Sequence, residues 1–136
     1  MSSPEGRADT TLRGSETVLL VEDEATLRML IRRMLEKFGY TVLEAGHGRE
    51  ALALCERHEG PIDVVVTDVV MPEMGGRELA EQLAARRGAR TPPVVYISGY
   101  PGSEGLVAQT SFLQKPFSFT SLVRTLRETL DATRRR

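Results

Sequence analysis

The chain has 136 residues, 40% of them hydrophobic and 27% charged, a length that suits one domain rather than two. Its formal net charge of −1 argues against a nucleic-acid partner, since proteins that bind DNA or RNA are usually basic. Cys55 is the only cysteine, which excludes a disulfide framework and a cysteine-based zinc site. With no apolar run of about 18 residues and no signal-peptide pattern, we expect a cytoplasmic protein without a membrane partner.

The two ends of the chain differ in composition from its middle. Residues 1–16 are polar, contain prolines and glycines and show no apolar periodicity, which predicts a flexible leader or linker. We expect the folded domain to span residues 17–132. Residues 133–136 form a short basic tail, for which a solvated helix end is the ordinary explanation.

Short apolar runs alternate with helical patterns along the rest of the chain. The runs predict strands at residues 18–21, 41–43, 62–67, 94–97 and 112–113. Apolar residues at helical spacing predict helices over residues 27–38, 51–55, 79–84 and 122–130. In the first of these helices we assign Leu27, Leu30 and Ile31 to the core. Ser118 is the expected N-cap of the last helix.

This alternation predicts βαβ units with right-handed crossovers and a mainly parallel sheet covered on both faces. Five strands fit the flavodoxin-like (βα)5 fold, a doubly wound α/β sheet of order 2-1-3-4-5. Only 13 residues separate Ser98 from Phe112, and Pro101, Gly102 and Gly105 disfavour a helix there. The fourth helix is therefore expected to be short or missing.

Residues that carry chemistry lie where the predicted strands end. Glu22 and Asp23 follow the first strand, Asp68 follows the third, Ser98 ends the fourth, and Lys115 comes shortly after the fifth. In parallel sheets, ligands bind beyond the carboxyl ends of the strands. Because these four strands are neighbours in the expected order, we expect the five side chains to lie close together.

Three carboxylates at one place repel each other unless one is protonated or a cation binds. A donor set made only of oxygen suits a hard cation, Mg²⁺ above all. Asp68 can then act as a nucleophile that forms an aspartyl-phosphate, with Lys115 and Ser98 stabilising the phosphoryl oxygens. Singly, each residue is explained by a helix cap, a turn or a solvated charge. Because they occur together at the ends of four strands, they favour a site that binds a cation and a phosphoryl group.

Four motifs in order and in register resemble the response-regulator receiver domain of two-component signalling. They are VLLVEDE at 18–24, VVVTDVVMPEMGG at 64–76, YISGY at 96–100 and FLQKPF at 112–117. The resemblance covers residues 17 to about 131, and the interval of 30 residues from Asp68 to Ser98 agrees with the family pattern.

The resemblance implies a role for each matching residue. Asp68 is the implied phosphoacceptor, and Glu22, Asp23 and the backbone carbonyl of Val70 join it as the implied Mg²⁺ ligands. Lys115 is the implied phosphate contact.

The resemblance also implies a switch between two conformations. Ser98 is the implied switch hydroxyl and Phe112 the implied switch aromatic, and Pro116 is a candidate for a cis peptide bond.

The family also implies partners. The phosphoryl group would come from a sensor or hybrid histidine kinase, or from a histidine phosphotransfer protein, and an unknown downstream protein would respond. Such a domain catalyses only its own phosphorylation and dephosphorylation and is not otherwise an enzyme. The leader resembles the junction before the C-terminal receiver of a hybrid kinase, so a free regulator and an excised domain both stay open, as does the oligomeric state.

Two alternatives remain at this point. One is a small Mg²⁺-dependent phosphatase with an aspartyl-phosphate intermediate. Such enzymes typically carry a second aspartate two residues after the nucleophile, where this chain has Val70. The other is a pseudo-receiver that is never phosphorylated and acts as a binding scaffold, against which the complete acidic set and Lys115 argue.

Overall fold

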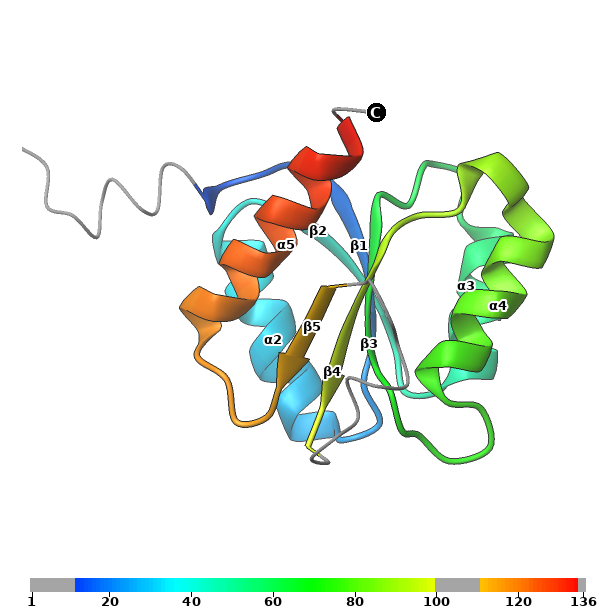
Figure 1. Ribbon diagram of the computed structural model, residues 1–136, viewed down its shortest axis with the longest axis horizontal. Coiled ribbons are helices and arrows are strands. Elements are labelled where there is room, and N and C mark those ends of the chain that lie inside the picture. The colour runs from blue at the N-terminus through cyan, green and yellow to red at the C-terminus, as the bar shows by residue number, and fades with distance from the viewer. Residues whose placement is uncertain (1–11, 100–110, 135–136) are drawn as a thin grey trace, which may run out of the picture.

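The computed structural model describes residues 12–99 and 111–134, and within them five parallel strands form one sheet. The strands are β1 (Thr17–Val21), β2 (Thr41–Ala45), β3 (Val64–Asp68), β4 (Val94–Ser98) and β5 (Ser111–Gln114). Their order is β2-β1-β3-β4-β5, and every pair is parallel (Figure 1). The predicted flavodoxin-like, doubly wound sheet of order 2-1-3-4-5 is therefore confirmed.

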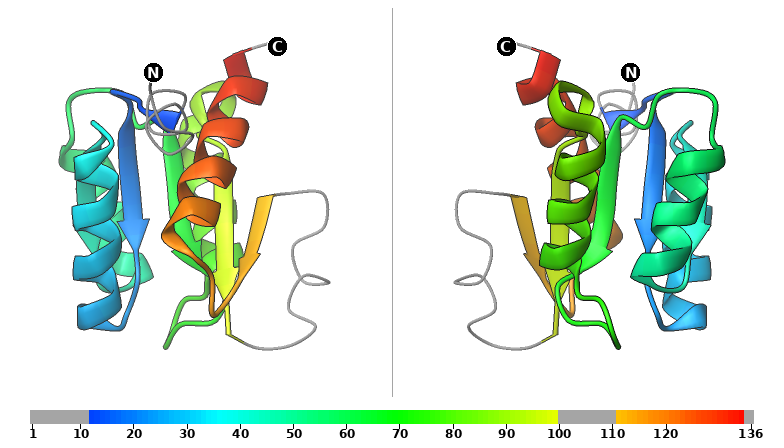
Figure 2. Two further views of the ribbon diagram at one scale, coloured as in Figure 1. Left: turned by 90° about the vertical axis from the view of Figure 1, so that its left-hand side faces the viewer. Right: turned by 90° about the vertical axis from the view of Figure 1, so that its right-hand side faces the viewer.

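Helices cover both faces of this sheet, α2 and α5 on one side and α3 and α4 on the other (Figures 1 and 2). They are α2 (Ala25–Lys37), α3 (Gly48–Arg57), α4 (Gly76–Arg87) and α5 (Phe119–Arg134), with the short 3-10 helix η1 (Gly88–Arg90) after α4. None of the described helices has the length and apolar character that a membrane crossing requires.

The central strands explain the two layers of core. Successive side chains of a strand point to opposite faces, so Val18 and Leu20 pack with α2 and α5 while Leu19 and Val21 pack with α3 and α4. All four residues are fully buried. A continuous apolar run is what a strand covered on both faces requires, and this is why β1 was predictable.

Two local signals lie where they were expected. Gly39 follows α2 with a φ of 103°, a conformation that glycine adopts without a steric penalty. The Oγ of Ser118 accepts a hydrogen bond of 3.0 Å from the backbone N–H of Ser121, which confirms the predicted cap of α5.

Two predicted details were wrong. The third strand begins at Val64 rather than at residue 62, because Asp63 forms hydrogen bonds with Thr17 at the start of β1. Its N–H donates to the carbonyl of Thr17, and its carboxylate accepts from the N–H of Thr17. In α2, Ile31 is fully buried but Leu30 is 43% exposed, because the buried stripe passes to one side of Leu30.

The packed part of the chain begins before the predicted boundary at Thr17. Leu12 is buried in the core beside Tyr40, the N–H of Gly14 donates to the carbonyl of Phe38 at 3.0 Å, and Glu16 is buried against Arg127. Leu12, Gly14 and Glu16 therefore have partners in the domain, although they lie in the segment predicted as a leader.

The remaining comparisons with the prediction concern the end of the domain and the segments outside the described residues. The last helix, α5, runs to Arg134, into the predicted tail. Other predictions lie outside the described residues: the leader over 1–11, the short or missing helix between β4 and β5 over 100–110, and the tail at 135–136.

Candidate functional site

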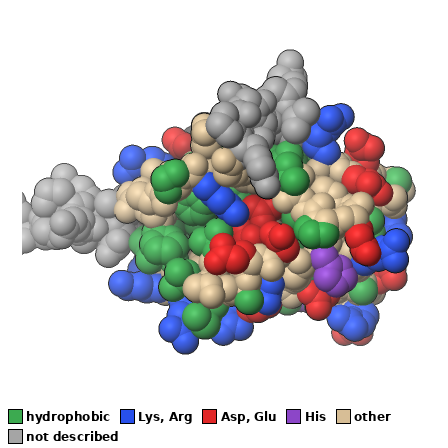
Figure 3. Space-filling model, turned by 90° about the horizontal axis from the view of Figure 1, so that it is seen from below, with side chains coloured by type: hydrophobic (Ala, Val, Ile, Leu, Met, Phe, Trp, Pro, Cys, Tyr) green, Lys and Arg blue, Asp and Glu red, His purple; other side chains and the backbone are tan. Residues whose placement is uncertain are grey.

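The residues predicted at the strand ends come together around one cavity at the carboxyl edge of the sheet. The cavity has a volume of about 310 Å³ and is lined by Glu22, Asp23, Glu24, Asp68, Val70, Ile97, Ser98, Gly99 and Lys115. Figure 3 views the molecule toward this edge and shows acidic side chains gathered there with a basic one beside them. The topology prediction was therefore sufficient to predict which residues meet.

The two buried acids, Glu22 and Asp68, are placed by neighbouring buried strands. Val21 pairs in register with Thr67, so the residues that follow them lie side by side. Glu22 is fully buried and Asp68 is 3% exposed. Gly76 lets the next helix approach, since a Cβ on it would lie 2.2 Å from the carbonyl oxygen of Asp68. The acids are thus held by packed backbone rather than by an open loop.

Lys115 reaches both acids from the far side of the cavity. Its Nζ lies 3.1 Å from Oε1 of Glu22 and 3.1 Å from Oδ1 of Asp68. Its backbone N–H donates to the carbonyl of Ser98 at 2.7 Å, and the Lys115–Pro116 peptide bond is cis. The ammonium group of Lys115 is therefore shared by two buried carboxyl groups.

The fold shifts the pKa values of the two acids in opposite directions. Burial, followed by the hydrogen bond and the charge of Glu22, raises the pKa of Asp68 to about 9, against a lowering by Lys115. Burial also acts to raise the pKa of Glu22, but its hydrogen bonds with Asp68 and with the N–H of Glu24, together with Lys115, lower it. Asp68 is thus the acid of the pair whose pKa the fold raises.

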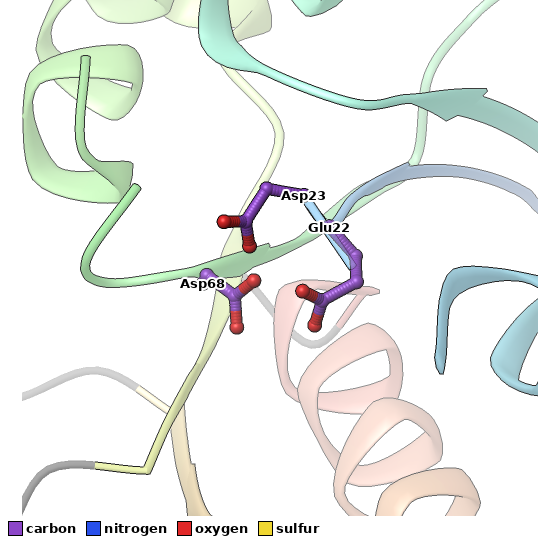
Figure 4. Close-up of side chains that lie close together, drawn as sticks. All are labelled: Glu22, Asp23 and Asp68. Carbon is purple, nitrogen blue, oxygen red and sulfur yellow. The ribbon is translucent and has the colours of Figure 1, made fainter. Parts of the chain in front are cut away.

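The same residues fit a divalent cation. One carboxylate oxygen each from Glu22, Asp23 and Asp68 lies within 4.8 Å of the others, and Figure 4 shows the three side chains converging. Oδ2 of Asp68 is buried and has no hydrogen-bond partner among the described residues. A buried oxygen without a donor is costly, and a cation would satisfy it. An all-oxygen donor set with an exposed Asp23 suits Mg²⁺, which keeps part of its water shell.

The remaining predicted residues lie around this centre. Ser98 is buried and lines the cavity, and Val70 lines it with 49% of its surface exposed. Phe112 pairs in register with Tyr96 and is half-buried against a small cluster that includes Val69. Phe112 thus lies on the strand next to Ser98, outside the cavity itself.

Sequence reasoning missed one residue that touches residues 22–24, the acidic loop between β1 and α2. The guanidinium Nη1 of Arg28, on α2, donates a hydrogen bond of 2.7 Å to the carbonyl oxygen of Glu22. The chain has sixteen arginines, and nothing in the local pattern separates this one from the others. Only the folded structure shows the contact.

Comparison with known proteins agrees with this architecture. Residues 18–127 match the family model described as the response regulator receiver domain. The chain belongs to this family. The family match covers nearly the whole described domain, and it includes all four receiver motifs found in the sequence.

Two relatives of this receiver domain are longer proteins, which it matches over part of their length. It is 45% identical over 127 residues to the sensor kinase CckA of Brucella abortus, a match that covers 90% of this chain and 13% of that protein. It is 35% identical over 130 residues to the transcriptional regulatory protein PdtaR of Mycobacterium tuberculosis, covering 90% of this chain and 60% of that one. The chain thus spans less than two thirds of either relative.

Solved structures confirm the fold of the receiver domain. The receiver domain of the hybrid histidine kinase CckA superposes with a TM-score of 0.72 at 37% identity, covering 84% of this chain and 98% of that one. The chemotaxis protein CheY4 of Vibrio cholerae superposes with a TM-score of 0.75 at 29% identity, covering 85% and 99%. The flavodoxin-like arrangement is thus shared with both.

Proposed function

We propose that this receiver domain accepts a phosphoryl group on Asp68 from a phosphohistidine, with Mg²⁺ as cofactor. The donor would be a sensor or hybrid histidine kinase, or a histidine phosphotransfer protein. The observation that carries the proposal is the buried Asp68 carboxyl, whose Oδ2 lacks a partner among the described residues while Glu22, Asp23 and Lys115 surround it. Buried strands hold this group at the edge of an open cavity, where a donor can reach it.

The transfer is a displacement at phosphorus. An oxygen of ionised Asp68 forms the new bond to phosphorus, the bond from phosphorus to the imidazole nitrogen breaks, and the histidine leaves with that electron pair. Held by Glu22, Asp23, Asp68 and the Val70 carbonyl, Mg²⁺ would favour ionised Asp68 and neutralise phosphoryl oxygens.

Two side chains then stabilise the transferred group. Lys115 is already within 3.1 Å of Asp68 and provides a positive charge for a phosphoryl oxygen. The buried hydroxyl of Ser98 lines the same cavity and donates a hydrogen bond to another oxygen after phosphorylation. These contacts exist only with the phosphorylated state, so they shift the equilibrium between two conformations toward the one that makes them.

Phe112 connects this shift to a partner surface. It is half-buried beside Tyr96 and Val69 and lies one strand away from Ser98. Movement of Ser98 toward the phosphoryl group leaves room for Phe112 to pack inward, which changes the surface offered to a downstream protein. Phe112 lacks the hydroxyl of tyrosine, so an outward position has no side-chain hydrogen bond to hold it.

Val70 argues against the phosphatase alternative. It lies in the cavity with half of its surface exposed, at the position where such enzymes carry a second aspartate as acid and base. An apolar side chain there cannot move a proton to or from an attacking water. We therefore place this domain among phosphoacceptors that act once per donor, rather than among enzymes that turn over.

The test is the intact mass of the protein after incubation with phosphoramidate, a small donor with a phosphorus–nitrogen bond. We expect one phosphoryl adduct that requires both Mg²⁺ and Asp68, and its loss in Asp68→Asn. The matched control, Asp131→Asn, removes an acid on α5 far from the cavity and should keep the adduct. An adduct on Asp68→Asn would contradict Asp68 as the phosphoacceptor. No adduct on the wild type with either phosphoramidate or a phosphorylated histidine kinase would contradict the proposal and favour the scaffold alternative.

A further inference from the structure

The loop that carries Glu22 and Asp23 is held by an arginine from the helix that follows it. Nη1 of Arg28 donates to the carbonyl oxygen of Glu22 at 2.7 Å, while Nε of the same guanidinium lies 3.4 Å from Oε1 of Glu44. Glu44 is part of β2 and pairs in register with Leu20 of β1. The guanidinium therefore connects the acidic loop to a strand of the sheet.

The bonded carbonyl belongs to the peptide that joins Glu22 to Asp23. A peptide unit is planar, so holding its oxygen in place restricts the rotation of the whole unit. Because the unit ends at the Cα of Asp23, the position of that Cα is restricted as well. The backbone N–H of Glu22 donates to the carbonyl of Ala45 at 3.1 Å. The side-chain Oε2 of Glu22 accepts from the N–H of Glu24 at 3.1 Å. Arg28 supplies the contact on the remaining side, toward Asp23.

The guanidinium has little freedom to move away. The side chain of Arg28 is 22% exposed, and a Cβ built on Gly46 would lie 3.2 Å from its Nη1, so the backbone at the end of β2 borders it. Arg32, one turn further along α2, binds the other oxygen of Glu44 at 2.6 Å. Within residues 12–99 and 111–134, Arg32 makes no hydrogen bond or ion pair with Glu22, so the two arginines share Glu44 but not the acidic loop.

We propose that Arg28 is a positioning residue for the cation site, which orients the Glu22–Asp23 peptide so that Asp23 faces Asp68. This inference rests on the proposed function, since it concerns the affinity of that site for Mg²⁺. Partners that orient metal ligands from outside typically change metal affinity by about 10-fold to 100-fold when removed. The expected effect of losing Arg28 is therefore weaker Mg²⁺ binding by about 10-fold or more.

The sign of the effect separates positioning from simple electrostatics. Arg28 is a cation, and removing a positive charge close to a cation site should by itself strengthen Mg²⁺ binding. Weaker binding after removal can therefore not be explained by the lost charge. It requires that the acidic loop has lost its orientation.

The test is calorimetric titration of the whole chain with Mg²⁺ alone, for the wild type, Arg28→Gln and Arg32→Gln. Both variants lose one positive charge and one contact to Glu44, but only Arg28→Gln loses the bond to Glu22. We expect about a 10-fold weaker affinity for Arg28→Gln and a change of less than about 2-fold for Arg32→Gln. Circular dichroism of each variant without Mg²⁺ checks that it is folded.

A measurement on the wild type covers the case in which Arg28→Gln does not fold. Nitrogen NMR of the arginine side chains should show the Nε signal of Arg28 shifting as Mg²⁺ is added, and that of Arg32 unchanged. Equal or tighter Mg²⁺ binding by Arg28→Gln, or a silent Arg28 signal during Mg²⁺ binding, would overturn this inference alone. A wild type that binds no Mg²⁺ would overturn the cation site of the proposed function together with it.

Discussion

Two buried clusters of charge, at opposite ends of the domain, are built in opposite ways. At the amino-terminal side, both oxygens of Glu16 are bound by Arg127, at 3.1 and 2.6 Å, and the same guanidinium lies 3.0 Å from Asp131. At the carboxyl edge, two buried acids share Lys115, and one oxygen of Asp68 has no partner among the described residues. We call the first cluster complete because both oxygens of its one buried acid are bound by arginine. The second has an excess of buried acid, since two buried carboxyl groups share one lysine.

The pKa values follow this difference. The side-chain hydrogen bond from Arg127 lowers the pKa of Glu16 to about 2, in spite of burial. Burial and Glu22 raise the pKa of Asp68 to about 9. Removing one partner of a buried ion pair destabilises a fold, and a buried acid without enough partners is itself unfavourable. The proposed phosphoacceptor site and the cluster expected to stabilise the fold thus lie at opposite ends of one small domain.

The largest expected effect comes from breaking the complete cluster. Arg127→Met leaves the carboxylate of Glu16 buried without its cation, and we expect the free energy of unfolding to fall by about 3 kcal/mol. Urea denaturation measures it. Arg124→Met, on an exposed position of the same helix, should change stability by less than about 0.5 kcal/mol. A loss as small as that of the control would show that the paired cluster does not stabilise the fold.

Removing the excess acid should act in the other direction. In buffer without Mg²⁺ at about pH 8, Asp68→Asn should raise the free energy of unfolding by about 1 to 2 kcal/mol, because the folded protein no longer holds an acid that burial disfavours. Since the folded pKa of Asp68 lies above the unfolded value of 3.8, the stability of the wild type declines as pH rises from about 4 to about 9. The gain should therefore be smaller at about pH 5.

Mg²⁺ provides the check on this interpretation. Thermal unfolding of the wild type should shift upward when Mg²⁺ is added, because only the folded state binds it, while Asp68→Asn should respond much less. An Asp68→Asn variant that is less stable than the wild type without Mg²⁺ would contradict the view that this cluster carries an unfavourable acid.

The complete cluster should show the opposite pH dependence. The folded pKa of Glu16 is depressed from 4.5 to about 2, so its contribution is present above about pH 4.5 and is lost as pH falls toward 2. We expect Glu16→Gln to cost about 1 kcal/mol near neutral pH and clearly less near pH 3. Urea denaturation of both proteins at the two pH values measures it. A cost that stays constant with pH would show that the charge of Glu16 is not what stabilises this end.

The smallest effect is expected at an exposed ion pair. Arg86 of α4 contacts Glu56 of α3, but both side chains are largely in solvent, at 43% and 64% exposure. Glu56→Gln should therefore change the free energy of unfolding by less than about 0.5 kcal/mol, and added salt should abolish even that. A change as large as that of Arg127→Met would mean that burial is not the property that distinguishes the ion pairs of this domain.

Much of the fold and of the site was predictable from the sequence, for a local reason. Continuous apolar runs such as residues 18–21 indicate buried strands, and their alternation with helices leaves one common parallel topology. That topology brings the ends of β1, β3, β4 and β5 to one edge. The meeting of Glu22, Asp68, Ser98 and Lys115 at one cavity therefore followed from the order of the strands.

The errors arose where an outcome depends on partners that are distant in the sequence. Residues 12–16 have the composition of a linker, yet Glu16 finds its cation 111 residues away in Arg127. Leu30 has the spacing of a core residue, but the position of α2 against the sheet leaves it at the edge. No local pattern contains this information, because it depends on where whole elements come to rest.

The sequence by itself thus determined which elements form, how they are ordered and which residue types meet at the carboxyl edge. The tertiary structure alone decided how those residues interact: that Lys115 is shared by two acids, that burial raises the pKa of Asp68, and that Arg28 rather than Arg32 contacts the acidic loop. The physical reason is range. Periodicity acts over a few residues, whereas burial, charge balance and hydrogen-bond geometry are properties of the packed domain.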